Sequence, residues 1–268
     1  MQRFQLVFRH YLKRTFMHKG NLLAMLILPI AIILLFAFVN DNWASEEGYN
    51  QLFYGYNVLH TSLVISNLFF FQLFGAFNNI DNLHEAMGND TKWRLFAAPV
   101  NRTVFTVGGM LASWVVSILQ GLIILAVTSI ILNVYWGNPL VNILTFLGLS
   151  LFAQVLGVLI FLITKNAAQG NAIAYPFIFF MGGLNGFIIP IRELMNHSII
   201  DFLANWSPLN LAMQAVTEGG RFGSLNLIDG VYPGGDMSIA IRNIVIIYVM
   251  AAVIGVISYT LGKVKRVW

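Results

Sequence analysis

Apolar segments without charged residues are the feature that most constrains this chain. The longest, residues 103–136, contains no Asp, Glu, Lys or Arg, and about 20 apolar residues suffice for a helix to cross a bilayer. Of the 268 residues, 58% are hydrophobic and 10% are charged, whereas soluble domains are about one quarter charged. Backbone polar groups in lipid must pair within the protein, which favours helices. The sequence therefore predicts an all-α integral membrane protein.

Six of these segments are predicted to cross the membrane, within a single transmembrane domain that comprises residues 1–268. The predicted transmembrane helices are residues 22–39, 54–77, 103–136, 141–164, 167–191 and 241–262. The third is longer than a bilayer requires, so we expect it to tilt or to protrude from the membrane.

The first 20 residues combine basic residues with apolar ones at helical spacing. Phe4, Phe8 and Tyr11 share one face of a helix, and Arg9 and Lys13 lie among them in the sequence. This pattern is typical of an amphipathic helix that lies in the membrane interface. The alternative is a charged flank that only sets the topology. A secretory signal is not expected, because the basic region is too long and no small-residue cleavage site follows the apolar run.

Residues 194–217 are mostly apolar but are interrupted by Asp201 and Pro208. Each half is too short to cross a bilayer. Two short helices that dip into the outer leaflet and return, a re-entrant hairpin, fit this pattern. The glycine-rich residues 219–235 that follow lack the lysine and Ser/Thr of a nucleotide-binding P-loop, so we interpret them as a loop.

Basic residues indicate the orientation of the chain. They concentrate in residues 1–20, in the segment 78–102, in the turn 165–170 and in the C-terminal tail. The opposite side holds only Arg192, Arg221 and Arg242. Because cytoplasmic loops are enriched in Lys and Arg, both termini are predicted to lie in the cytoplasm of a multi-pass protein of the cell membrane. This topology accounts for the net charge of +4, so no nucleic-acid partner is expected.

Residues 78–102 form a long polar interruption between two apolar segments. Asp81 or Asn82 can cap a helix, and Glu85 follows Asn82 at the spacing of a capping box. Pro99 would end that helix. The sequence therefore predicts a short cytoplasmic helix at residues 82–98. It is either a solvated connector or a docking element for a soluble partner.

Motifs for catalysis are not found in the sequence. It has no P-loop, H-E-x-x-H or G-x-S-x-G motif, no cysteine and no His or acidic cluster with metal-ligand spacing. No catalytic residue, metal site or resident cofactor is therefore expected. The predicted transmembrane helices also have no charged residue at mid-membrane depth. Transporters driven by protons or sodium usually need such groups, so their absence argues against that class.

Neutral polar and aromatic residues form stripes on two predicted transmembrane helices. In the second helix the stripe is Asn57, His60, Asn67, Phe71, Phe74 and Asn78; in the fifth it is Asn171, Tyr175, Gly182 and Asn185. Such stripes usually mark contacts between helices of one subunit. The alternative is a pathway for an amphipathic or lipid-like substrate. The candidate pathway residues are Asn57, His60, Asn67, Phe71, Tyr175 and Asn185.

Together these features resemble the permease subunit of type-2 ABC exporters (the ABC-2 family). The resemblance rests on the predicted topology and on a local motif in the segment 78–102. That family tends to have an acidic residue, a glycine and then Leu-Leu-Ala-x-Pro-Val-x-Arg. Here the matching residues are Glu85, Gly88, Leu95, Phe96, Ala97, Ala98, Pro99, Val100 and Arg102. Ser207-Pro208-Leu209 also resembles the Pro-Leu segment of the family's outer hairpin.

The resemblance implies a transmembrane subunit that works with two cytosolic ABC ATPase subunits and a second permease, identical or homologous, in contact with membrane lipid. ATP and Mg²⁺ would bind the partner ATPase, so this chain would not itself be an enzyme. The helix at residues 82–98 would be the coupling helix that docks on the ATPase. Its candidate contacts are Leu83, Glu85, Met87, Asp90, Lys92, Arg94 and Leu95. The candidate pathway residues would face the interface between two permeases.

The implied function is ATP-driven export of a hydrophobic or amphipathic substrate, such as a drug, antibiotic, peptide or lipid-like molecule, which would connect the protein with antibiotic resistance. Export of a lipid-linked glycan is an alternative within the same family. Outside it, a secondary transporter or channel without an ATPase partner remains open, as does a membrane-embedded enzyme or assembly factor.

Overall fold

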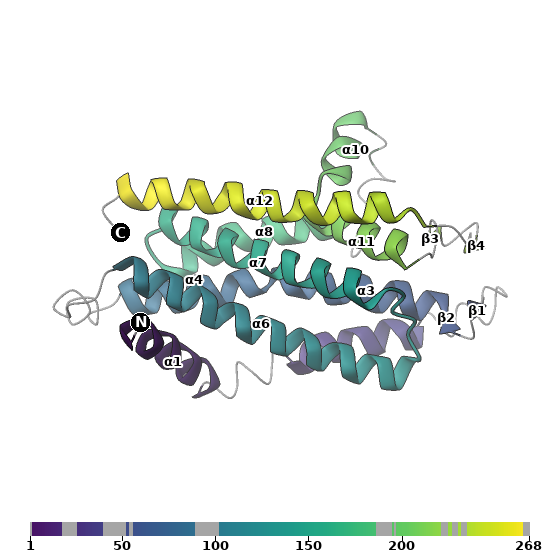
Figure 1. The fold of residues 1–268 in the computed structure, drawn as a ribbon, viewed down its shortest axis with the longest axis horizontal. Helices are drawn as coiled ribbons and strands as arrows, with labels where there is room; N and C mark the ends of the chain where they lie inside the picture. Colours follow the sequence, from purple (N-terminus) through teal and green to yellow (C-terminus); the bar gives the residue numbers. More distant parts are fainter. Residues whose placement is uncertain are drawn as a thin grey trace.

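The computed structural model describes residues 2–17, 26–39, 52–53, 56–88, 102–185, 195, 197–220, 225–226, 230–231 and 235–264. Its helices form an elongated bundle in which most of them follow the long axis (Figure 1). The helices are α1 (Gln2–Met17), an unlabelled helix (Leu26–Val39), α3 (Val58–Leu73), α4 (Gly75–Gly88), α6 (Arg102–Leu132), α7 (Pro139–Ile163), α8 (Ala167–Leu184), α10 (Ser198–Asn205), α11 (Pro208–Gly219) and α12 (Met237–Val264). Two antiparallel hairpins complete the described chain: β1 (Leu52–Phe53) with β2 (Tyr56–Asn57), and β3 (Leu225–Asn226) with β4 (Gly230–Val231).

Four described helical stretches are long and apolar enough to cross a membrane. They are His60–Met87, Thr103–Leu132, Pro139–Ile163 and Met237–Val264. The helix Leu26–Val39 is apolar but shorter, and α8 is a continuous helix of 18 residues that contains Pro176. The chain is therefore an α-helical, multi-pass membrane protein. The strands lie at one end of the bundle, whereas α1 and the C-terminal end of α12 lie at the other (Figure 1).

The second predicted transmembrane helix differs most from its expected bounds. Residues 52–53 pair with residues 56–57 as β1 and β2, so Asn57 lies in a strand and α3 begins at Val58. A turn at Phe74 separates α3 from α4, and α4 then continues to Gly88. The capping-box spacing predicts a helix start at Asp81 or Asn82, but α4 continues through both residues. Their side chains form hydrogen bonds with neighbouring helices and do not cap a new helix.

The connection between α6 and α7 is well defined. The third predicted transmembrane helix ends at Leu132 rather than at Trp136, because Asn133 adopts the left-handed backbone conformation with φ of 49°. Gly137, with φ of 62°, adopts the same conformation shortly before α7 begins. The Asn138 side chain then accepts hydrogen bonds from the backbone N–H groups of Leu140 and Val141. Pro139 occupies the first turn of α7, where its missing N–H costs nothing.

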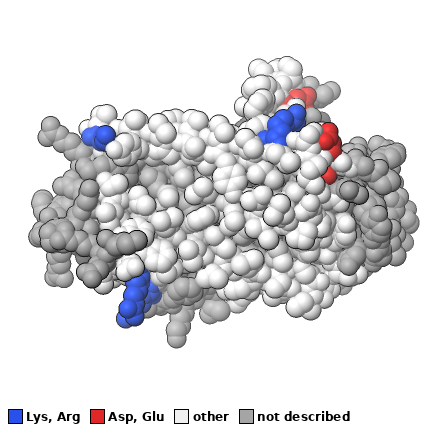
Figure 2. All heavy atoms as spheres, in the orientation of Figure 1, with Lys and Arg blue, Asp and Glu red and all other residues white. Residues whose placement is uncertain are grey.

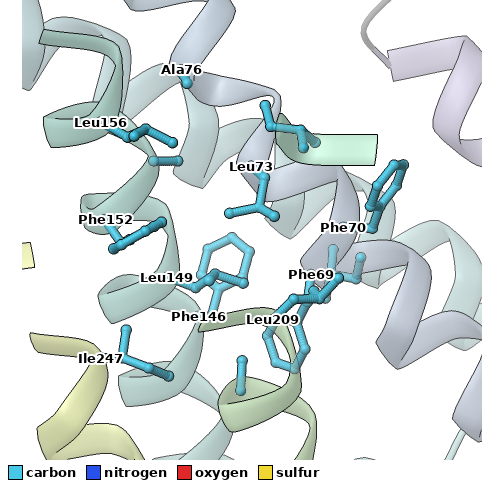
Figure 3. Packing of buried hydrophobic residues seen from close by; sticks show 14 of the residues in the cluster. Phe69, Phe70, Leu73, Ala76, Phe146, Leu149, Phe152, Leu156, Leu209 and Ile247 are labelled. Carbon is cyan, nitrogen blue, oxygen red and sulfur yellow. The ribbon is translucent and has the colours of Figure 1, made fainter. Parts of the chain in front are cut away.

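The main core lies where α3, α4, α7 and α11 meet. Figure 3 shows Phe69, Leu73 and Ala76 facing Leu149, Phe152 and Leu156 of α7. Backbones approach closely at Gly157, where a Cβ atom would lie 2.7 Å from the carbonyl oxygen of Ala76. Small residues permit this close packing between helices in a membrane, which positions α4 against α7.

The strand end of the bundle also carries α10 and α11. The α11 helix packs on α7 and α12 through a cluster of Val141, Ala215, Ala240 and Ile244. Asn243, which is fully buried, donates a hydrogen bond to Gln214 of α11. On the face drawn in Figure 2, the acidic atoms lie at this end beside a group of Lys and Arg atoms, and further Lys and Arg atoms lie at the opposite end. A broad band of described residues without charged atoms separates the two ends.

Candidate functional site

The turn between α3 and α4 is held by polar side chains from two other helices. Gln154 Nε2 of α7 donates to the Gly75 carbonyl oxygen at 3.3 Å and to Ser117 Oγ of α6 at 3.1 Å. Asn79 Nδ2 donates in turn to the Gln154 carbonyl oxygen at 2.7 Å. Backbone groups released by an interrupted transmembrane helix need such partners. The interruption at Phe74 is therefore a built feature of this bundle.

On the C-terminal side of that turn, side chains of α4 contact α6, α8 and the residue at the end of α7. Asn82 Nδ2 donates to Ser113 Oγ of α6 at 3.2 Å, and His84 Nε2 lies 3.0 Å from Thr164 Oγ1 at the end of α7. Asn171 Nδ2 of α8 donates to Asp81 Oδ1 at 2.9 Å. These contacts fix the second half of α4 immediately before residues 89–101, which lie outside the described chain.

The α1 helix contacts both helices that flank residues 89–101. Buried Val7 and Tyr11 form one cluster with Ala86 of α4 and Ala112 of α6. Gly108 of α6 permits this approach, because a Cβ atom there would lie 2.9 Å from the Val7 side chain. The sequence predicts an amphipathic helix here. In the structure its apolar face packs on α4 and α6, with Arg9 and Lys13 exposed.

The candidate coupling residues fall into four groups. Leu83 is fully buried against Val158 and Phe161 of α7, so it belongs to the core and not to a docking surface, which corrects the sequence-based assignment. Met87 is partly buried and packs beside the α1 cluster. Glu85 is exposed. The others lie outside the described residues: Asp90, Lys92, Arg94 and Leu95.

The candidate pathway residues do not share one exposed face. His60, Asn67 and Phe71 are buried inside the single chain. The Asn67 amide donates to the Leu63 carbonyl oxygen of its own helix at 2.7 Å, which explains how a polar side chain is accommodated there. Among the members of the set whose exposure the structure describes, only Tyr175 of α8 is strongly exposed, at 46%. The expected common surface is therefore not formed by this set: Asn57 lies in β2, and Asn185 ends α8 with its N–H bonded to the Gly182 carbonyl oxygen.

A different set of side chains joins α3 and α4 to α8. Ring centroids lie 4.1 Å apart for Phe77 and Tyr175, 6.1 Å for Phe74 and Phe179, and 5.9 Å for Phe70 and Phe179. We call Phe70, Phe74, Phe77, Tyr175 and Phe179 the aromatic ladder. Its α8 members are half exposed, whereas Phe70 and Phe77 are buried.

Sequence reasoning missed most of the aromatic ladder. The available signal was the spacing of Phe70, Phe74 and Phe77, which matches that of one helix face. The same spacing relates Tyr175 to Phe179 on α8. The sequence does not show that these two faces meet.

A comparison with protein families identifies the class of this bundle. The model of the ABC-2 type transporter family matches residues 2–219, from α1 to the end of α11. The chain belongs to the ABC-2 type transporter family. No curated protein matches it. Permeases of this family generally work with ATPase subunits, so the chain is the transmembrane component of an ABC-2 transporter.

The ABC-2 match includes the helices that flank residues 89–101 and all helices of the aromatic ladder, whereas α12 lies beyond it. In the part of the chain that the structure describes, no three His, Cys, Asp or Glu residues gather where a metal ion could bind. The features of this ABC-2 chain that we consider as candidate functional sites are the bonded second half of α4 and the aromatic ladder.

Proposed function

We propose that this chain is the permease subunit of an ATP-driven exporter, paired with a second permease and powered by two separate cytosolic ATPase subunits. ATP and Mg²⁺ would bind the ATPase, and this chain would contribute no catalytic group. The observation that carries the proposal is the packing of α1 on both α4 and α6. It braces the two ends of residues 89–101 in a protein of the ABC-2 family.

The α4 helix offers a route for the coupling motion. It runs from the interruption at Phe74 to Gly88, and its last turns belong to the proposed coupling helix at residues 82–98. Its contacts with α6, α7 and α8 involve buried or partly buried side chains. A displacement of the dock would therefore move α4 together with its neighbours, with the turn at Phe74 as the point of adjustment.

The aromatic ladder supports a hydrophobic or amphipathic substrate taken from the cytoplasm or the inner leaflet. Aromatic rings offer large apolar faces, and Tyr175 and Phe179 are 46% and 44% exposed. A drug, an antibiotic, a peptide or a lipid-like molecule has suitable apolar surface. A lipid-linked glycan remains an alternative, because its sugars also stack on aromatic rings.

We also propose six transmembrane helices, with both termini in the cytoplasm and with α10 and α11 forming a re-entrant hairpin at the outer side. In Figure 2 the acidic atoms lie only at the end that carries α10 and α11, whereas the opposite end shows only Lys and Arg atoms among its charged described residues, which supports this orientation. Cysteines introduced at Asn196 and Glu218 should both react with an impermeant thiol reagent added outside, and the chain has no native cysteine. Labelling of either position only from the cytoplasm would rule out the hairpin.

The coupling proposal is tested by purifying the complex and replacing Glu85 and Arg94 together by alanine. We expect the ATPase to co-purify with the wild-type chain and substrate-stimulated ATP hydrolysis to be lost in the double variant. The matched control replaces Glu218 and Arg242, an acidic and a basic residue at the opposite end of the bundle, and should keep the stimulation. Intact stimulation in the Glu85/Arg94 variant would refute the assigned dock.

One observation favours a second candidate, a secondary transporter without an ATPase. Asp81, a partly buried carboxylate within a candidate transmembrane helix, is the kind of group that ion-coupled transporters use. The same purification separates the two candidates. A chain that transports in vesicles without any co-purifying ATPase would favour the second.

A further inference from the structure

A carboxylate lies one helical turn from the aromatic ladder. Asp81 follows Phe77 by four residues on α4, and Asn171 precedes Tyr175 by four residues on α8. Residues four apart lie on the same helix face, so the hydrogen-bonded pair Asp81–Asn171 continues the ladder below the ring pair Phe77–Tyr175. The two helices thus present stacked rings that end in an acid.

The polar pair leaves hydrogen-bonding capacity unused. Asp81 Oδ1 accepts one hydrogen bond, from Asn171 Nδ2 at 2.9 Å. Within the described residues Asp81 forms no ion pair. The opposite atom of the amide, Asn171 Oδ1, is buried without a hydrogen-bond partner in the same part of the chain. A partly buried carboxylate and an unsatisfied acceptor side by side both favour an N–H donor that carries positive charge.

Among the described residues, the other charged or titratable groups nearby do not fulfil that role. His84, one turn farther along α4, is engaged with Thr164. Lys165 lies in the exposed turn between α7 and α8, where its backbone N–H bonds to Gln169. Glu85 carries negative charge and is exposed on the next turn of α4. The electrostatic environment of the Asp81–Asn171 pair is therefore suited to a cation supplied from outside the chain.

We propose that the aromatic ladder and the Asp81–Asn171 pair form a binding site for a protonated amine carried on an aromatic or otherwise apolar body. The apolar body stacks on Tyr175 and Phe179, whose rings are half exposed. The ammonium group binds Asp81 and donates to Asn171 Oδ1, with additional attraction from the ring faces. This inference names the substrate class of the exporter, and so it rests on the proposed function.

The test measures ligand binding to the full-length chain in lipid nanodiscs, with protein-free nanodiscs as background. The probes are pyrenemethylamine, which is protonated at neutral pH, and pyrenemethanol, which has the same aromatic body without the charge. We expect the wild-type chain to bind the amine more tightly than the alcohol. Asp81→Asn should lower the amine affinity about tenfold, since a charged contact of this kind contributes roughly that factor, and leave the alcohol affinity unchanged. Tyr175→Leu should weaken both.

Two further variants keep the result interpretable. Asp81→Glu retains the charge and should retain the preference for the amine. Asp236→Asn removes an exposed carboxylate before α12 and should change neither affinity. An unchanged amine-to-alcohol ratio in Asp81→Asn, an equal loss of both affinities, or no amine binding by the wild type would overturn the proposal. The assay contains no ATPase, so its failure is distinct from a failure of co-purification, which would count against the exporter function itself.

Discussion

Two helical stretches of similar length, His60–Met87 (α3 and α4) and α12, behave in opposite ways. Of the 18 consecutive residues that are most apolar in each stretch, 83% are buried in the first and 17% in α12. Yet the buried stretch is the less apolar of the two. It carries Asn67, Asn79 and Asp81, whereas the exposed residues along α12 include Val245 and Val249.

This inversion follows from the solvent. Hydrocarbon is as apolar as a leucine side chain, so apolar burial alone does not decide which helix enters the centre of a membrane bundle. A polar side chain that faces lipid loses its hydrogen bonds with water, which costs a few kcal/mol. The central position of α3 and α4 is therefore determined by hydrogen bonds and close packing on several sides. The α12 helix packs on α7 and α11 through one face, and its other face is apolar and exposed in the single chain.

The largest expected effect comes from a methyl group added at the close contact between α4 and α7. Gly157→Ala would place its Cβ atom 2.7 Å from the Ala76 carbonyl oxygen, and overpacking of this kind costs about 1–3 kcal/mol. In α12, the nearest atom to a Cβ at Gly255 lies 3.7 Å away. Gly255→Ala should therefore be neutral or stabilise by up to about 1 kcal/mol through helix propensity.

Thermal unfolding of both variants in detergent measures this difference. We expect a lower melting temperature for Gly157→Ala and an equal or higher one for Gly255→Ala. Equal destabilisation of the two variants would mean that α12 is packed as tightly as α4, and the contrast between the two helices would be lost.

A smaller effect is expected from the hydrogen bonds at the turn between α3 and α4. Gln154→Leu removes the donor to the Gly75 carbonyl oxygen and to Ser117, and interhelical bonds in membranes contribute about 0.6–2 kcal/mol. Thr260→Val in α12 removes only a bond to Ile257 of the same helix. Chemical unfolding should show a measurable loss for the first variant and about 0.5 kcal/mol or less for the second.

These two regions also show what the sequence can predict. The apolar segments, the short helices in 198–219 and the polar interruption before α6 are local patterns. The continuity of α4 through Asp81 and Asn82 does not follow from a local pattern. In the sequence these two residues look like helix caps, but in the structure they bond to Asn171 and Ser113 of distant helices. Sequence reasoning therefore placed a helix start where the structure has a continuous helix.

The candidate site was predicted only in part for the same reason. Helical spacing assigns Asn67 and Phe71 to one face, but it does not reveal whether that face meets lipid, a second subunit or the same chain. In the structure both side chains are buried by the chain itself. The aromatic ladder depends on the pairing of α4 with α8, and no local pattern encodes that pairing.

The smallest expected effect concerns the beginning of α12, outside its membrane-spanning part. Hydrogen bonds from the Ser238 side chain and backbone lower the pKa of Asp236. The stabilisation is therefore present above the usual pKa of an aspartate and is lost as the pH falls through the lowered value. Below neutral pH, wild type should lose slightly more stability than Asp236→Asn in thermal unfolding. Parallel pH profiles would show that this cap contributes nothing.

The central claim is that residues 89–101, which follow the buried α4, receive the ATPase. Amine-specific cross-linking of the purified complex, followed by mass spectrometry, tests this claim most directly. Lys92 follows α4, whereas Lys263 lies in the last turn of α12. We predict that Lys92 is cross-linked to a soluble ATPase subunit. An ATPase cross-linked through Lys263 but never through Lys92, or a complex without any ATPase, would contradict the account.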